Sequence, residues 1–137
     1  MKRFILPLLF CVLLCSCMAT NDTWGLSMTG EQVSPTGITL LVTQDGSNYP
    51  GTELYSGSLF TLECKTDNGW QRVDYLIDEE MLGWNAEQWP IADKSETRWE
   101  ENWEWLHGAL VPGEYRISKV ISNGLTEQTY YVEFQIP

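Results

Sequence analysis

The chain has 137 residues, and its 19 Asp and Glu against 8 Lys and Arg give a formal net charge of −11 at pH 7. This acidity excludes nucleic acids and other polyanions as partners, because binding to them depends on clustered Lys and Arg, and the sequence has no such cluster. The length suits one domain, which would bury roughly two thirds of its unfolded surface.

The chain begins with the pattern of a secretory signal peptide. Lys2 and Arg3 form a basic start, and an apolar run follows from Phe4 to Leu14. That run is shorter than the about 20 residues that a membrane-spanning helix needs. A basic head, a short apolar stretch and then small residues are typical of an exported protein's leader.

The end of this leader resembles the lipobox of bacterial lipoproteins. The stretch Leu14-Cys15-Ser16-Cys17 has an aliphatic residue, then a small residue directly before the cysteine. The resemblance implies a signal peptide over residues 1–16, a lipid on Cys17 and a short tether up to residue 24. Ordinary secretion, with Cys17 as part of the leader, is the alternative.

Removal of residues 1–16 would leave 121 residues, with 6 basic residues against 19 acidic ones and a net charge of −13. If Cys17 carries lipid, Cys64 is the single remaining thiol, so no internal disulfide can form and packing alone must stabilise the domain. Alternation with Phe60 and Leu62 predicts that Cys64 is buried and inert. We expect a monomer, anchored on the outer face of the cell membrane.

From residue 25 on, short alternating runs separated by turn residues predict an antiparallel β domain. Asn68-Gly69 favours a type I′ hairpin turn, and Asn123-Gly124 ends another run. Seven or eight such strands predict an all-β, two-sheet sandwich over residues 25–137. The runs are Ile38 to Val42, Phe60 to Cys64, Trp70 to Ile77, Tyr115 to Ile121 and Tyr130 to Ile136, with short segments near 26–30 and 84–91.

A tyrosine directly after a Pro-Gly turn supports the sandwich. In Leu110-Val-Pro-Gly-Glu-Tyr-Arg-Ile117, Gly113 lies in the turn and Tyr115 opens the next strand. This is typical of the tyrosine corner, in which the hydroxyl bonds to backbone a few residues upstream. We therefore expect Tyr115 and Gly113 to be structural residues.

The stretch Trp99-Glu-Glu-Asn-Trp-Glu-Trp105 fits two periods. As a strand, residues 97–105 place Trp99, Trp103 and Trp105 on one face, together with Glu101. As a helix, Trp99, Trp103 and Leu106 share a stripe. The surrounding β signals favour the strand, so Trp103 and Trp105 are predicted to lie in the core.

A second hypothesis for the tryptophans is a sugar platform, in which flat indoles stack on sugar rings and carboxylates bind hydroxyls. Trp84 and Trp89, in Gly83-Trp-Asn-Ala-Glu-Gln-Trp89, and Trp99 are the candidate ligand-binding residues.

Two charged residues interrupt apolar stripes: Glu101, and Lys119 between Ile117 and Ile121. If the two strands belong to opposite sheets, these residues can meet at the edge of the core as an ion pair. The alternative is that one of them sits at a bulge and points outward.

The chain from about Gly25 to Ile136 resembles the bacterial immunoglobulin-like domain family of exported proteins and lipoproteins of Gram-positive bacteria, especially clostridial ones. The resemblance is strongest in Asn102-Trp-Glu-Trp-Leu-His-Gly108 and in Leu110 to Ile117 with Lys119. The resemblance implies an Ig-like Greek-key β-sandwich. It implies no activity, since the family has no catalytic residues to carry over. His107 stands where relatives have an aromatic residue, so it is interpreted as a packing position.

Constellations for catalysis or metal binding are absent from the sequence. Its one histidine, His107, leaves little for a catalytic triad, and the three adjacent acids Asp78-Glu79-Glu80 are typical of a solvated turn. We expect no cofactor and no metal. The predicted function is a non-catalytic protein-binding or structural module, with a cell-wall or host glycan as the alternative ligand.

Overall fold

The computed structural model describes residues 24–46 and 53–137. The predicted signal peptide and the lipidated Cys17 lie outside these residues. The described part holds nine strands, a 3-10 turn (η1) and a four-residue helix (α1): β1 (Leu26–Ser34), β2 (Gly37–Gln44), β3 (Tyr55–Ser56), β4 (Thr61–Thr66), β5 (Gly69–Arg72), η1 (Glu79–Met81), β6 (Trp89–Pro90), β7 (Glu96–Asn102), α1 (Glu104–His107), β8 (Gly113–Ser122) and β9 (Glu127–Ile136).

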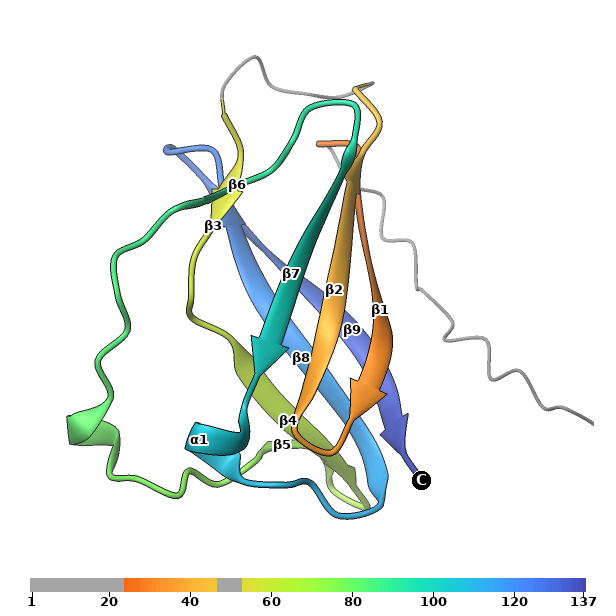
Figure 1. The fold of residues 1–137 in the computed structure, drawn as a ribbon, viewed down its shortest axis with the longest axis vertical. Helices are drawn as coiled ribbons and strands as arrows, with labels where there is room; N and C mark the ends of the chain where they lie inside the picture. Colours follow the sequence, from red (N-terminus) through yellow and green to blue (C-terminus); the bar gives the residue numbers. More distant parts are fainter. Residues whose placement is uncertain (1–23, 47–52) are drawn as a thin grey trace, which may run out of the picture.

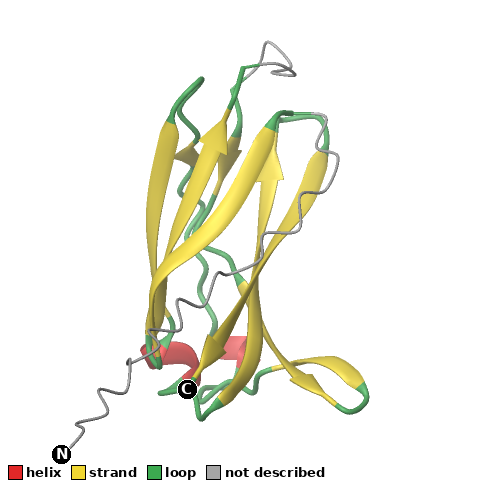
Figure 2. Cartoon of the chain, turned by 90° about the vertical axis from the view of Figure 1, so that its right-hand side faces the viewer, coloured by secondary structure: helices red, strands yellow, loops and turns green. Residues whose placement is uncertain are grey.

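The strands form two antiparallel sheets that pack face to face (Figures 1 and 2). One sheet has the order β1-β2-β7. In the other, β8 pairs with β9 on one side and with β4 and β3 on the other, and β5 and β6 lie beyond these. The chain passes from one sheet to the other after β2, β6 and β7, as in Greek-key Ig-like sandwiches. The predicted fold class is confirmed, and the two-residue strands β3 and β6 add to the seven longer strands of the described chain.

The core lies between the sheets, and the predicted alternation builds it. In β2, Ile38, Leu40 and Val42 are buried, and in β9 the even-numbered residues from Tyr130 to Ile136 are buried. Successive side chains of a strand point to opposite faces, so each strand delivers one apolar row to the interior. Each such side chain contributes about 1.5–3 kcal/mol when it is fully buried.

The tyrosine corner is confirmed. The hydroxyl of Tyr115 donates a 2.7 Å hydrogen bond to the carbonyl oxygen of Val111, and the ring stacks on Phe134 with 5.8 Å between centroids. Gly113 lies against this ring, and a Cβ there would be in ordinary contact, 3.4 Å from a Tyr115 ring atom. Burial raises the pKa of Tyr115, which keeps the hydroxyl protonated as a donor.

The β4–β5 hairpin differs from the prediction. Thr66 pairs with Gly69, so Asp67 and Asn68 form the loop, and of these residues only Gly69 has a positive φ, +98°. A type I′ turn requires positive φ at both central residues, so that prediction is wrong. The return strand also ends at Arg72 rather than at Ile77.

A long connection, residues 73–95, follows β5 and runs along one side of the sandwich to β7 (Figure 1). It contains η1 and β6. Two backbone hydrogen bonds fix its ends: Leu76 N donates to Leu106 O at 2.8 Å, and Ile91 N donates to Leu54 O at 2.9 Å. The connection therefore brings Trp84 and Trp89 beside the tryptophans of β7 and α1.

Candidate functional site

The tryptophan stretch is a strand followed by a helical turn. Strand β7 ends at Asn102, and Trp103 has φ −109° and ψ 3°, which ends the alternation. The Trp103 indole N–H donates to the carbonyl oxygen of Pro35 at 2.7 Å, and its ring stacks on Phe134. Trp103 is fully buried, as predicted.

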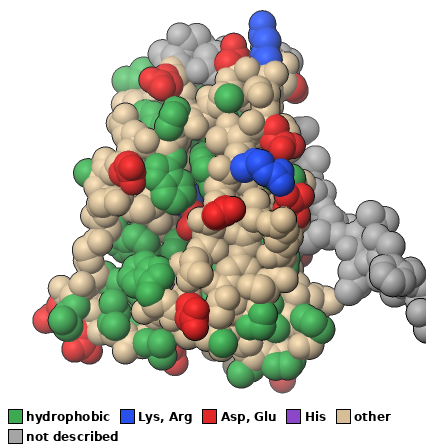
Figure 3. All heavy atoms as spheres, in the orientation of Figure 1, with side chains coloured by type: hydrophobic (Ala, Val, Ile, Leu, Met, Phe, Trp, Pro, Cys, Tyr) green, Lys and Arg blue, Asp and Glu red, His purple; other side chains and the backbone are tan. Residues whose placement is uncertain are grey.

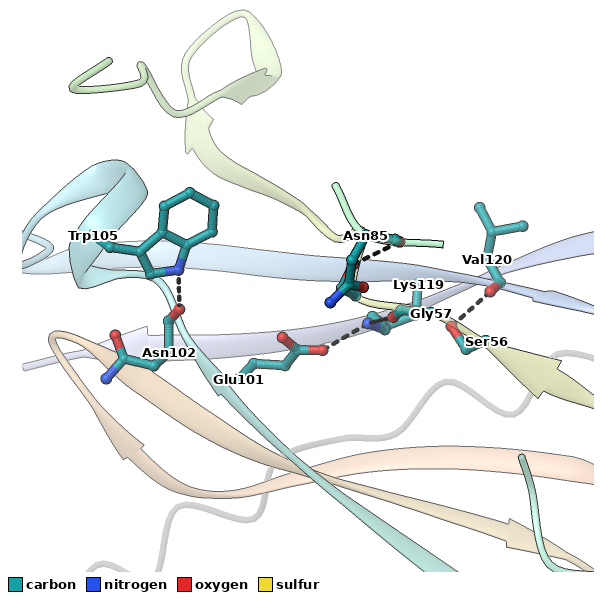
Figure 4. A network of polar contacts seen from close by, with 9 residues as sticks. Ser56, Gly57, Asn85, Glu101, Asn102, Trp105, Lys119 and Val120 are labelled. Atoms are coloured by element: carbon teal, nitrogen blue, oxygen red, sulfur yellow. Dashed lines mark hydrogen bonds and ion pairs between the residues drawn. The ribbon is translucent and has the colours of Figure 1, made fainter. Parts of the chain in front are cut away.

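Trp105 does not lie in the core, so that prediction is wrong. Its side chain is 52% exposed, because the helical turn at Glu104 rotates it away from the side that holds Trp103. Its indole N–H donates to the carbonyl oxygen of Asn102 at 2.9 Å, which fixes the ring at the surface (Figure 4). The residue predicted to be structural is thus the most accessible tryptophan of the stretch.

The three tryptophans proposed as a sugar platform separate into two aromatic contacts. Trp99 is buried, 7% exposed, and packs against half-buried Trp89 with 5.9 Å between ring centroids. Trp84 is half-buried and meets Trp105 edge-on at 5.8 Å, with Phe60 behind it at 5.5 Å. These indoles pack against one another and do not form one flat surface.

The ion pair between Glu101 and Lys119 is confirmed. The Lys119 ammonium lies 2.6 Å from a Glu101 carboxylate oxygen, and it also donates to the carbonyl oxygen of Gly57 at 2.5 Å (Figure 4). β7 and β8 supply the two residues from opposite sheets. Both side chains are buried, so the alternative of an outward-pointing residue at a bulge is wrong.

Two indoles complete the surroundings of Lys119. Its ammonium lies 4.2 Å from the ring centroid of Trp89 and 5.6 Å from that of Trp99. Cation–π attraction of this kind strengthens where water is excluded. Lys119 therefore connects both sheets with the long connection.

Burial dominates the electrostatics of this pair. It raises the pKa of Glu101 against the opposing attraction of Lys119, and it lowers the pKa of Lys119 against the attraction of Glu101. Both directions mean that the loss of hydration outweighs the mutual attraction. Each charge is tolerated in the interior only because the other is present.

An apolar surface lies at the α1 end of the sandwich. We call it the end patch and define it by Leu76, Ile77, Met81 and Trp105, with half-buried Trp84 beside them. Leu76 is 67% exposed and Met81 is 75% exposed. Figure 3 shows hydrophobic side chains gathered over this part of the face, with acidic side chains at their margin.

Acidic residues surround the end patch. The exposed acids on the same segments are Asp74, Asp78, Glu79, Glu80 and Glu104. Arg72, at the end of β5, is the basic residue that precedes this segment. Its guanidinium pairs with Glu79 and lies over the ring of Tyr75, 4.9 Å from the ring centroid. The patch is thus apolar at its centre and negative at its rim.

A family model described as the bacterial Ig-like domain matches residues 22–135. The chain belongs to the bacterial Ig-like domain family. No curated protein and no solved structure shows significant similarity to it. Membership in this family suggests a non-catalytic structural or binding module.

Other residues of this Ig-like domain that can carry chemistry serve packing or face solvent. His107 is buried, its Nδ1–H donates a 2.9 Å hydrogen bond to the carbonyl oxygen of Asp74, and its ring lies 5.1 Å from the ring of Tyr75. Burial lowers its pKa, which favours the neutral ring. Cys64 is half-buried against the core, more accessible than predicted.

The described ranges of the Ig-like domain, 24–46 and 53–137, contain no group of three His, Cys, Asp or Glu side chains placed to hold a metal ion. In the same ranges, no helix is long and apolar enough to cross a membrane.

The end patch was missed by the sequence analysis. Leu76 and Ile77 lie in the run that was predicted to be a return strand up to Ile77, which would have explained them as strand residues, but the strand ends at Arg72. The sequence does hold a signal for this surface: the apolar residues Leu76 and Ile77 are followed by the acids Asp78-Glu79-Glu80 and then directly by Met81.

Proposed function

We propose that this protein is a non-catalytic module, anchored to the outer face of the cell membrane by lipid on Cys17, that binds another protein through the end patch. The observation that carries the proposal is that exposed apolar side chains gather at one end of the sandwich (Figure 3). Single exposed apolar residues are ordinary, whereas contiguous apolar patches with a polar rim mark interaction sites.

The framework beneath the end patch supports a preformed binding surface. Leu76 is fixed by its backbone bond to Leu106, and Trp84 is held between Phe60 and Trp105. A surface that is already ordered loses little conformational entropy when a partner binds. Trp105 is exposed in this surface, and tryptophan is one of the residue types enriched among those that dominate binding energy.

The anchor follows from the leader pattern. A lipid on Cys17 would leave residues 18–23 as the tether to Trp24, and six extended residues reach about 20 Å. Two or more acyl chains hold a protein stably at a membrane, whereas one chain is marginal. The domain would then operate close to the membrane surface.

Protein is favoured over glycan as the ligand because of the side chains at the patch. Leu76 and Met81 are flexible aliphatic groups, which suit an apolar protein surface. Sugar stacking needs flat, accessible indole faces, and Trp99 is buried. Trp89 has the Lys119 ammonium over its ring.

The test compares Met81→Ser/Trp105→Ser with a control, Leu125→Ser, which removes an 89% exposed side chain from the loop between β8 and β9. Purified full-length proteins are immobilised and exposed to surface proteins and to cell-wall polysaccharide from the producing cells. We expect the wild type and the control to retain the same protein and the patch variant to lose it, with unchanged melting temperatures. Retention of polysaccharide alone would contradict the proposal.

Anchoring is tested separately with Cys17→Ala. We expect this variant to lose labelled palmitate and to leave the membrane fraction, while the wild type keeps both. Palmitate incorporation that survives the substitution would overturn the lipid assignment.

A further inference from the structure

We infer that the partner presents an apolar segment flanked by Lys or Arg, so that its basic residues meet the acidic rim of the end patch. This inference rests on the proposed function and names the chemistry of the partner at the same surface. It follows from three features of the described residues: which side chains are exposed, which charges surround them, and which alternatives those charges disfavour.

The exposed apolar centre determines what the middle of the partner must be. Leu76, Met81 and Trp105 are all more than half exposed, and their contact with water is removed only by an apolar surface. The indole N–H of Trp105 donates a hydrogen bond to the carbonyl oxygen of Asn102, so this N–H needs no acceptor from a partner. An aliphatic or aromatic side chain of the partner can therefore cover the ring without leaving an unpaired donor.

The rim determines the charge of the partner around that centre. Of the five acids on these segments, Glu79 already pairs with Arg72, whereas Asp78, Glu80 and Glu104 have no ion pair among the described residues. Charges at the rim of an interface steer association and select partners more than they add affinity. Basic residues of a partner would find carboxylates on both segments that border the patch, near η1 and at α1.

The same charges disfavour a second copy of this chain as the occupant. Two end patches in contact would bring the acids of both rims together, and like charges across an interface are repulsive. An acidic membrane surface is disfavoured for the same reason. A basic and apolar protein segment is the occupant that satisfies both parts of the surface.

The experiment uses the full-length lipidated protein in nanodiscs of zwitterionic phosphatidylcholine, with empty nanodiscs as the blank. Two fluorescent helical peptides serve as probes: one built from Leu and Lys with separate apolar and basic faces, and its counterpart in which every Lys is Glu. Fluorescence anisotropy gives the Kd of each peptide at about 50 mM and about 500 mM salt, between which the screening length falls several-fold.

Two matched variants separate local charge from overall charge. Glu80→Gln/Glu104→Gln removes two acids from the rim. Glu53→Gln/Glu127→Gln removes two exposed acids, one two residues before β3 and the other at the first residue of β9. In Figure 1, β3 and the start of β9 lie at the end of the sandwich opposite α1. Both variants have the same net charge, so a difference between them reports position alone.

We expect the Leu/Lys peptide to bind more tightly than the Leu/Glu peptide. At low salt, Glu80→Gln/Glu104→Gln should raise the Kd of the Leu/Lys peptide about 2- to 30-fold, the range for two exposed ion pairs. Glu53→Gln/Glu127→Gln should change this Kd less than about 2-fold. Trp105→Ala should weaken binding of the Leu/Lys peptide about 30-fold, as expected when an aromatic residue that dominates binding energy is removed. High salt should remove the advantage of the wild type over the rim variant.

The possible failures are distinguishable. Equal binding of both peptides, with loss on Trp105→Ala, would overturn the basic partner and leave the end patch as a binding surface. Binding that is insensitive to Trp105→Ala would overturn the surface itself and with it the proposed function. Equal weakening by the rim and distant variants would show that the attraction is general, which also overturns the inference.

Discussion

Replacing Lys119 by Met tests how the buried ion pair contributes to the fold. Met has a similar length and no charge, so the substitution keeps most of the packing against Trp89 and Trp99. It removes the ammonium from Glu101, whose carboxylate then stays buried without the cation that lies 2.6 Å from it. The carbonyl oxygen of Gly57 loses its donor as well.

The size of the effect follows from the state of Glu101. An unpaired buried carboxyl avoids its charge by taking up a proton, and pH 7 is 2.5 units above the ordinary pKa of 4.5. Each unit corresponds to about 1.36 kcal/mol, so protonation at pH 7 costs about 3.4 kcal/mol. This agrees with the about 3–5 kcal/mol lost when one partner of a buried pair is removed. We expect the free energy of unfolding to fall by that amount.

The pH dependence gives the sharper test. In the folded Lys119→Met variant, burial raises the pKa of Glu101 without an opposing ammonium, so Glu101 keeps a proton that the unfolded chain has lost. The contribution of this proton to the free energy of unfolding is therefore fully present below about pH 4.5 and is lost as the pH rises through the raised pKa of Glu101. The loss caused by Lys119→Met should accordingly be largest at pH 7 and shrink as the pH falls toward about 4.5.

The assay is urea unfolding followed by tryptophan emission, over the range from about pH 7 to about pH 4.5. The control is Glu101→Leu/Lys119→Met, which removes both charges and should recover most of the lost stability, because apolar replacements of buried pairs are often neutral or stabilising. A loss below about 1 kcal/mol at pH 7, or a loss independent of pH, would show that Glu101 does not depend on Lys119 for its burial.

Three further predictions concern single residues. Tyr115→Phe removes the hydrogen bond to Val111 and should lower the free energy of unfolding by about 0.5–1.5 kcal/mol, measured by urea unfolding; no change would contradict the tyrosine corner as a stabilising bond. Gly69→Ala meets no atom within 4 Å but must hold φ near +98°, so we expect a loss of about 1 kcal/mol from backbone strain alone, and an unchanged melting temperature would count against it. His107 has a lowered pKa, so its contribution is present above pH 6.5 and is lost as the pH falls through its folded value; the stability advantage of the wild type over His107→Gln should shrink on acidification, and a growing advantage would reverse the sign.

Strands with a regular period could be read from the sequence. The alternation in β2 and β9 identifies both the strands and their inward faces, because a period of two is a local property of a strand. Two charges in apolar rows raised the pair between Glu101 and Lys119 as one hypothesis, beside an outward-pointing residue at a bulge, and the structure decides for the pair. An interrupted inward row requires a partner, and two such rows can supply it to each other.

The end of β7 could not be read in the same way. Strand and helix periods both fit residues 97–105, and contacts distant in sequence decide between them. Trp103 bonds to Pro35, 68 residues away, and this bond fixes Trp103 inward where the strand stops. The outward position of Trp105 follows from that stop. The sequence therefore does not reveal the candidate site, because the strand period predicts a core position for Trp105.

The most direct test of the account places a photocrosslinking amino acid at position 105 of the full-length protein, with the same group at position 125 as the control. Irradiation of producing cells should give one discrete protein adduct from position 105, and that adduct should be absent from position 125. The same adducts from both positions, or none from position 105, would contradict the end patch as the surface through which this domain binds its partner.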